Sequence, residues 1–218
     1  MTGTEYSPHE QRQRDPSRLI AFTDGVFAII ITILVLELRV PELSEGHTLR
    51  QSLEEIRPTF VSFVLSFLLI GMYWAWHRTE FAEVRFINFH VVWLNLMFLL
   101  PAAMVPFAAS LLGKYETSAV ALHLYGAVMI AATLFRMTLD WYLRRHPGLL
   151  WDPESAQTKH LRTLTSTLAL VLYVLAMAVA EALPRLSIAL YFGVPAIYLA
   201  VVTFLTSDPK TRAAAQDL

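Results

Sequence analysis

The chain has 218 residues, of which 56% are hydrophobic and only 16% charged, with a mean hydropathy of +0.49. That composition excludes an ordinary soluble domain, because such domains carry about 25% charged residues. The net charge of −1 argues against a nucleic-acid partner, and the absence of cysteine excludes disulfides and thiolate metal sites. We therefore expect an all-α, polytopic membrane protein.

The first predicted membrane helix covers residues 18–38 and follows a polar tail at residues 1–17 that we expect to be cytoplasmic. After Arg18, its only ionisable residues are Asp24 near the start and Glu37 at the end. About 20 predominantly apolar residues are enough to cross a bilayer as a helix. An ionisable residue inside such a span suggests a functional site, although Asp24 lies close enough to Arg18 to be an interfacial end residue instead.

A short interfacial helix is expected next, because Thr48 and Gln51 have the spacing of a capping box. The second membrane helix is predicted from Thr59 to about Trp76, just after a first-turn proline. The third is predicted from about residue 84 to 112, kinked or broken by its two prolines, Pro101 and Pro106.

The fourth, fifth and sixth membrane helices are predicted at about residues 117–139, 161–183 and 188–206. The sequence Asp152-Pro153 has the form of an N-cap with a first-turn proline, and residues 207–218 form a second polar tail. Residues 18–206 are therefore predicted to be one six-helix domain with both termini on one side. Most Lys and Arg residues of the short loops fall on that side, which predicts cytoplasmic termini.

Polar residues recur at one depth of the first three predicted helices. Asp24, His77 and Asn95 lie at or near the same membrane edge, together with Asn88 and His90. Lipid cannot satisfy these groups, so they either face the bundle and bond one another or lie in headgroup water. The sequence alone leaves both interpretations open.

The sequence also resembles a known family. Arg18-x-x-x-Phe22-Thr23-Asp24 resembles the Arg-x-x-x-Phe-Ser-Asp signature of the transmembrane protein 175 family, the lysosomal and prokaryotic potassium channels, with Thr23 in place of Ser. Further likenesses are Trp74-x-x-His77-x-x-x-Phe81 and Trp93-Leu-Asn95 followed by Pro106-Phe107. The resemblance implies a structural polar network that holds the first helix in place, formed by Arg18, Phe22, Thr23, Asp24, Trp74, His77 and Asn95.

One face of the first helix is a candidate pore lining. Ile29, Thr32, Ile33 and Leu36 follow a 0, 3, 4, 7 spacing and share one helix face. Residues alone favour ordinary helix packing there, because every face of a membrane helix is apolar. The Thr-Val-Gly-Tyr-Gly signature of carbonyl potassium filters is absent.

The resemblance changes this interpretation. It implies that four copies of a six-helix subunit assemble and that the first helix of each lines a central pore. By motif position, Ile29 would form the narrowest ring, with Thr32 or Ile33 one turn further and Leu36 two turns further. Glu37 would either raise the local cation concentration at the pore mouth or pair with Arg39.

The leading hypothesis is a potassium-preferring cation channel, homotetrameric, in a prokaryotic plasma membrane, with K+ as the permeating ion and no cofactor. A proton-coupled transporter or proton pathway through Asp24 and His77 is the alternative. A non-conducting membrane scaffold is the third. The chain shows neither the ligand spacing of a zinc site nor a nucleophile elbow, so no enzyme is predicted.

Overall fold

The computed structural model describes residues 15–41, 48–151 and 156–207. Within these ranges the elements follow in the order α1 (Ser17–Leu36), α2 (Leu49–Glu55), α3 (Arg57–Ala82), α4 (Phe89–Ala103), α5 (Val105–Lys114), α6 (Ala119–Arg145), the short 3-10 helix η1 (Pro147–Leu149), α7 (Ala156–Val179) and α8 (Pro184–Ser207). The all-α prediction is confirmed. Asp152-Pro153 and most of the two predicted tails lie outside the described residues.

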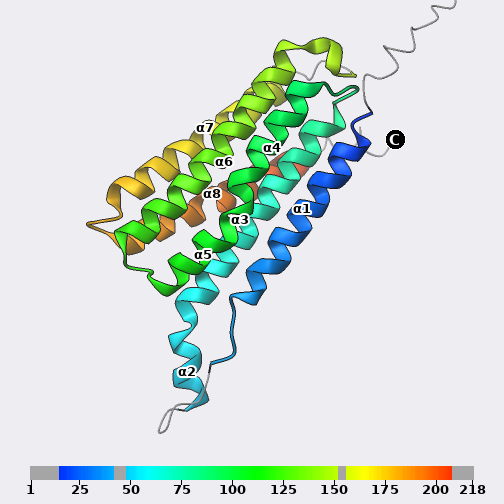
Figure 1. The fold of residues 1–218 in the computed structure, drawn as a ribbon. Helices are drawn as coiled ribbons and strands as arrows, with labels where there is room; N and C mark the ends of the chain where they lie inside the picture. Colours follow the sequence, from blue (N-terminus) through cyan, green and yellow to red (C-terminus); the bar gives the residue numbers. More distant parts are fainter. Residues whose placement is uncertain (1–14, 42–47, 152–155, 208–218) are drawn as a thin grey trace, which may run out of the picture.

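The long helices run side by side as an elongated bundle (Figure 1), and six segments are long and apolar enough to cross a membrane. The predicted six spans are therefore confirmed, with α4 and α5 together forming the third. The start of α1 and the end of α8 lie at the same end of the bundle, here called the terminal end. The opposite end is called the distal end, and α2 extends beyond it (Figure 1).

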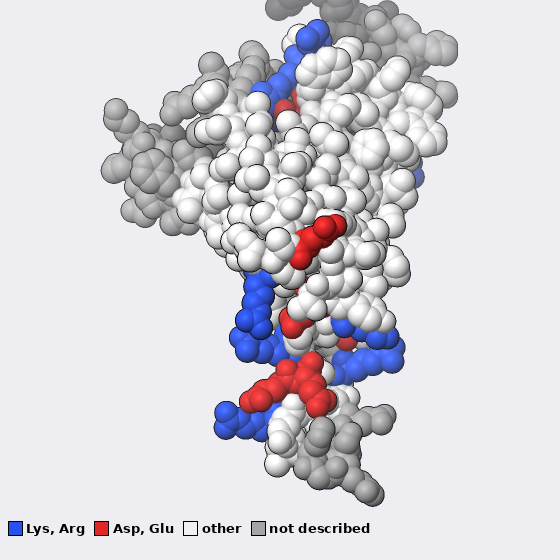
Figure 2. Space-filling model, turned by 90° about the vertical axis from the view of Figure 1, so that its left-hand side faces the viewer, with Lys and Arg blue, Asp and Glu red and all other residues white. Residues whose placement is uncertain are grey.

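The exterior of the bundle suits a bilayer. On the face drawn in Figure 2, uncharged side chains form a broad band, and most of the charged side chains gather below it. A band without charged groups is the surface that hydrocarbon solvates, because a charged side chain in the bilayer centre is costly. The described residues thus form a polytopic membrane protein.

Several predicted helix ends were wrong. The fifth span, predicted at about residues 161–183, is α7 at Ala156–Val179. Two other helix ends were predicted too early. α3 continues past Trp76 to Ala82, and α6 continues to Arg145, about two turns further than predicted in each case. Polar residues in these last turns pair with neighbouring helices, so they do not end the helix. His77 consequently lies inside α3 and not at its end.

The predicted start of the third span was also wrong. Residues 84–88 are not helical, because Val84 forms a β-bridge with Leu150 beyond α6. The span begins at Phe89, where the Asn88 side chain caps α4 by accepting the Val91 backbone N–H at 3.0 Å. Asn88 is therefore a helix cap.

The prolines behave as their missing N–H groups predict. Pro101 lies inside α4, which ends two residues later, and Pro106 lies in the first turn of α5, so the span is broken at Met104. Pro195 is accommodated inside α8. The capping box of Thr48 and Gln51 is present at the start of α2, as predicted.

Candidate functional site

Helix α1 lies at the edge of the bundle, where it packs against α3, α4 and α5 (Figure 1). Its buried residues are Leu19, Thr23, Phe27, Ile30 and Leu34, which recur every three or four positions and form one stripe. The helix therefore has one face against its own bundle and a second face that no described part of the same chain covers.

The candidate pore residues all lie on the uncovered face. Ile29 is 58% exposed and Leu36 71%, whereas Phe27 and Leu34 are each 1% exposed. Thr32 and Ile33 are exposed as well. Thr32 donates its hydroxyl hydrogen to the Ile29 carbonyl at 2.9 Å, which leaves the lone pairs of its oxygen available to a ligand. The face thus combines large aliphatic side chains with a single hydroxyl.

Two separate hydrogen-bonded groups hold the first half of α1 to its neighbours. Trp74 donates its indole N–H to Asp24 at 2.8 Å. The amide nitrogen of Asn95 donates to the Thr23 hydroxyl at 2.8 Å, and its carbonyl oxygen lies 3.0 Å from Nε2 of His77. Because an amide oxygen only accepts, His77 must donate through Nε2–H. Asn95 is thus the bridge between α1, α3 and α4.

His77 is enclosed by aromatic rings. Its imidazole stacks on Phe81 with ring centroids 4.1 Å apart and lies 6.4 Å from the ring of Phe27. The side chain is buried, and Nδ1 has no hydrogen-bond partner among the described residues. Because these rings fix the imidazole in place, His77 is well suited to donate a constant hydrogen bond from α3 to Asn95 of α4.

Two residues that the resemblance includes in the network lie outside it. Arg18 is exposed at the start of α1, and no hydrogen bond or ion pair joins it to the others within the described ranges. Phe22 is also exposed, on the same helix face as Ile29 and Leu36. Both point away from α3 and α4, because they are out of phase with the buried stripe of α1.

At the other end of α1, Glu37 is half-buried and accepts a hydrogen bond from the Ser110 hydroxyl of α5 at 2.6 Å. No ion pair with Arg39 forms in the described part of the chain, so that suggested pairing was wrong. The separation in sequence of 73 positions explains why Ser110 could not be found as the partner beforehand.

A buried ion pair was also missed. Arg136 of α6 lies 2.5 Å from Glu80 of α3, both almost fully buried, and it also contacts the Ser166 hydroxyl of α7. The ring of Trp76 covers the guanidinium, with its centroid 4.5 Å from Cζ. The sequence does show Glu80 and Arg136 as charged residues within or next to apolar spans. That they pair with each other depends on how the helices pack. The pair joins α3, α6 and α7 on the side of α3 away from α1.

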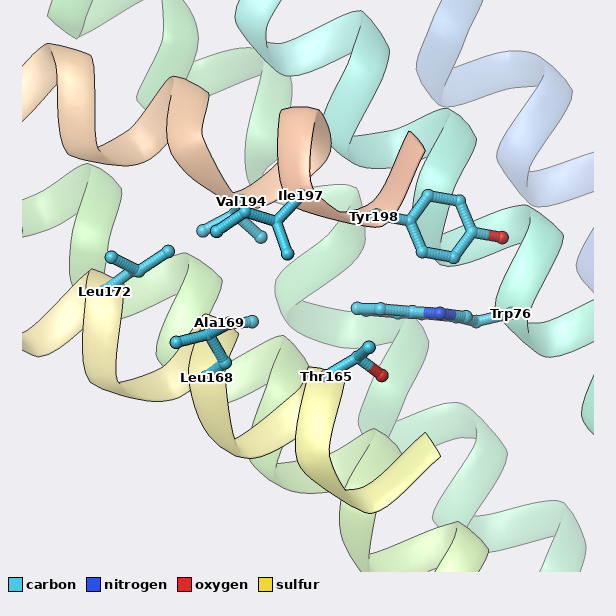
Figure 3. A pocket seen from close by; sticks show the side chains of 8 residues that line it. All are labelled: Trp76, Thr165, Leu168, Ala169, Leu172, Val194, Ile197 and Tyr198. Atoms are coloured by element: carbon cyan, nitrogen blue, oxygen red, sulfur yellow. The ribbon is translucent and has the colours of Figure 1, made fainter. Parts of the chain in front are cut away.

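The interior offers no room for a substrate at the cavity drawn in Figure 3. It lies between α7, α8 and Trp76 of α3, and its volume is about 10 Å³, close to the least that one water needs. In the described residues no cluster of three or more metal-ligating side chains occurs. The candidate site is therefore the uncovered apolar face of α1, a helix with polar contacts at both ends.

These features define a multi-pass helical membrane protein whose first helix lies at the edge of the bundle. Residues 18–106 match the sequence profile of the endosomal/lysosomal potassium channel TMEM175. A potassium channel of Chryseobacterium is 33% identical over 184 residues, covering 84% of this chain and 91% of its own. The chain belongs to the TMEM175 family, and it is an ion channel rather than an enzyme.

Further similarities come from two sequence relatives and one solved structure. A potassium channel of Streptomyces collinus is 37% identical over 64% of this chain and 69% of its own. The crystal structure of a lysosomal potassium-selective channel TMEM175 homologue from Chamaesiphon minutus superimposes with a TM-score of 0.74 at 28% identity, covering 85% of this chain and 96% of that one. More distant is the human endosomal/lysosomal proton channel TMEM175, 26% identical over 86% of this chain and 36% of its own.

Proposed function

We propose that the protein is a potassium-preferring cation channel that conducts passively through a pore lined by α1. The observation that carries this proposal is the uncovered face of α1. On this face, Ile29, Ile33 and Leu36 form an apolar stripe that also contains the hydroxyl of Thr32. The bacterial relatives named potassium channels, and the potassium-selective homologue of like fold, support the choice of ion.

The constriction is formed by Ile29, Thr32 or Ile33, and Leu36. Rings of large aliphatic side chains gate by dewetting and sieve cations by diameter and by the cost of removing water. Potassium is dehydrated at lower cost than sodium, so such a ring favours potassium. The oxygen of Thr32, with its hydrogen already donated to Ile29, replaces part of the water that the ion loses.

A closed pore requires several copies, because α1 stands at the edge of its own bundle (Figure 1). We propose a homotetramer in which four α1 helices surround one axis. The polar contacts of Thr23, Asp24 and Asn95 hold α1 at a fixed rotation, so the same face points to the axis in every copy. Their role in this proposal is structural and not ion binding.

The placement in the membrane follows from the loops. We place the protein in a prokaryotic plasma membrane with the terminal end, and hence both chain termini, in the cytoplasm. The excess of Lys and Arg in the loops of that end supports this orientation.

Liposome flux tests the proposal. Ile29→Ala and Leu36→Ala should each widen the ring, raise cation flux and lower the preference for K+ over Na+. Phe27→Leu, a mild change on the buried face of the same helix, is the matched control and should leave the preference unchanged. Unchanged flux and selectivity in both pore-face variants would contradict the proposal that α1 lines the pore.

Proton permeation is the second candidate, favoured by the exposed Asp24 at the terminal end of α1 and by the name of the human relative. His77 is less suited to relay protons, because it is buried behind Asn95. Proton uptake driven by a pH gradient in K+-free liposomes, lost in Asp24→Asn while K+ flux remains, would support this function. Coupled, saturable uptake in place of unitary currents would instead indicate a transporter.

A further inference from the structure

Among the described residues, a single side-chain hydrogen bond joins the distal end of α1 to another helix. Near the terminal end, Trp74 and Asn95 bond α1 from α3 and α4. In the distal half, the described residues provide only the bond from Ser110 of α5 to Glu37. The packing between these two regions is apolar, through Phe27 and other buried side chains.

The charge of Glu37 is unfavourably placed for the stability of α1. It is the C-cap of the helix, where the partial negative charge of the helix dipole disfavours a carboxylate. No Lys or Arg forms an ion pair with it within the ranges that the structure describes. A carboxylate without a cationic partner, next to the uncovered face of α1, retains its attraction for mobile cations.

The backbone around Ser110 is held in place by contacts between α5 and α3. α5 is a separate helix after the break at Met104, and α3 holds it at two points. The Ser62 hydroxyl donates to the Ala109 carbonyl at 2.6 Å, one residue before Ser110. Gly113 approaches so closely that an added Cβ would lie 2.8 Å from the Thr59 Cα. Ser110 therefore presents its hydroxyl from a fixed backbone.

We infer that Ser110 is a positioning residue that holds the Glu37 carboxylate at the rim of the distal pore mouth, where it concentrates cations before they enter the constriction. The inference rests on the proposed pore along α1. Glu37 lies at the margin between the covered and uncovered faces, so its side chain can turn toward α5 or swing out into water. The Ser110 bond selects one placement, the same in every copy.

Ionic strength tests the inference. At about 0.01 M salt the screening length is about 30 Å, whereas at about 1 M it is about 3 Å. Glu37→Gln should therefore lower the single-channel K+ conductance several-fold at low salt and little at high salt. Ser110→Ala should give a smaller loss with the same salt dependence, and Ser110→Thr, which keeps a hydroxyl, should restore most of the conductance.

The double variant separates positioning from a general packing effect. If Ser110 acts through Glu37, Ser110→Ala should change nothing further in the Glu37→Gln background. An equal loss in both backgrounds, a loss independent of salt, or no loss in Glu37→Gln would each overturn the inference. Ile29→Ala, measured beside these variants, distinguishes the two failures: if it alters conduction while they do not, the pore stands and only the role of Ser110 is wrong.

Discussion

Asn95 forms the buried polar link between α1, α3 and α4. It uses its amide nitrogen for Thr23 and its oxygen for His77, and none of the three side chains is exposed to any extent. A polar group buried in this way needs its partner, because no water replaces a lost bond. Asp24 and Trp74 form a bond of similar length at the exposed edge, where water can substitute.

We expect Asn95→Ala to destabilise the protein by about 1–3 kcal/mol for each buried group left unsatisfied. Trp74→Phe keeps an aromatic ring but removes the indole N–H that bonds Asp24, and the loss of that bond should cost about 0.5–1.5 kcal/mol. Unfolding of the purified variants in detergent, followed by circular dichroism, measures both. Equal losses would show that Asn95 has no special place in the network.

The residues of this network could be chosen from the sequence, but their pairing could not. Spacing on each helix put Asp24, His77 and Asn95 at one depth, and the motif resemblance pointed to Thr23 and Trp74. The rotation of each helix about its own axis decides which side chains form hydrogen bonds with each other. That rotation placed Arg18 outside the network, and it joined Glu80 to Arg136, two charges that had no visible relation.

At the scale of elements, the packing of α6 against α7 and α8 depends on a missing side chain. A Cβ added at Gly126 would lie 2.5 Å from Met177 Cγ and 2.5 Å from the Tyr191 hydroxyl oxygen. Small residues at such points let membrane helices approach closely. Gly71 of α3 is different, since an added Cβ there would meet nothing within 4 Å.

Gly126→Ala should therefore destabilise the bundle by about 1–3 kcal/mol through overpacking. Gly71→Ala should be neutral or stabilising by about 0.4–1 kcal/mol, because alanine restricts the unfolded chain at no steric cost. Thermal unfolding in detergent compares the two. A Gly126→Ala variant as stable as the parent would mean that Met177 and Tyr191 can move aside.

Helix existence was predictable and helix ends were less so. Each span is a helix of 18 or more residues that is apolar enough on average to cross a membrane. The ends of α3 and α6 were placed too early, because charged residues there were taken to meet water. They are satisfied instead by other helices, as Glu80 is by Arg136.

At the scale of the whole molecule, the described part of the chain leaves one apolar face of α1 uncovered, and in the proposed channel further copies of the chain enclose it. The sequence contains no cysteine, so a single introduced one reports on this arrangement without background. Leu36 is 71% exposed near the distal end of α1. Val120 at the start of α6 is 73% exposed at the same end but belongs to a helix outside the proposed pore.

We expect Leu36→Cys to form disulfide-linked dimers in membranes on mild oxidation, because four copies would meet around the axis. Val120→Cys, equally accessible, should remain monomeric. Non-reducing electrophoresis reads both. Cross-linking of Val120→Cys and not of Leu36→Cys would place a different face at the centre of the assembly.

The sequence by itself determined the six spans, the interruption of the third span by Pro101 and Pro106, and the cap of α2, because hydrophobic length, proline and capping residues act locally along the chain. It also placed Ile29, Thr32, Ile33 and Leu36 on one face, since helical periodicity is a local property. Only the tertiary structure decided which face of α1 the bundle covers, and which partners Glu37 and Arg136 find. Those outcomes depend on how helices distant in the chain are rotated and packed, and no local pattern encodes that geometry.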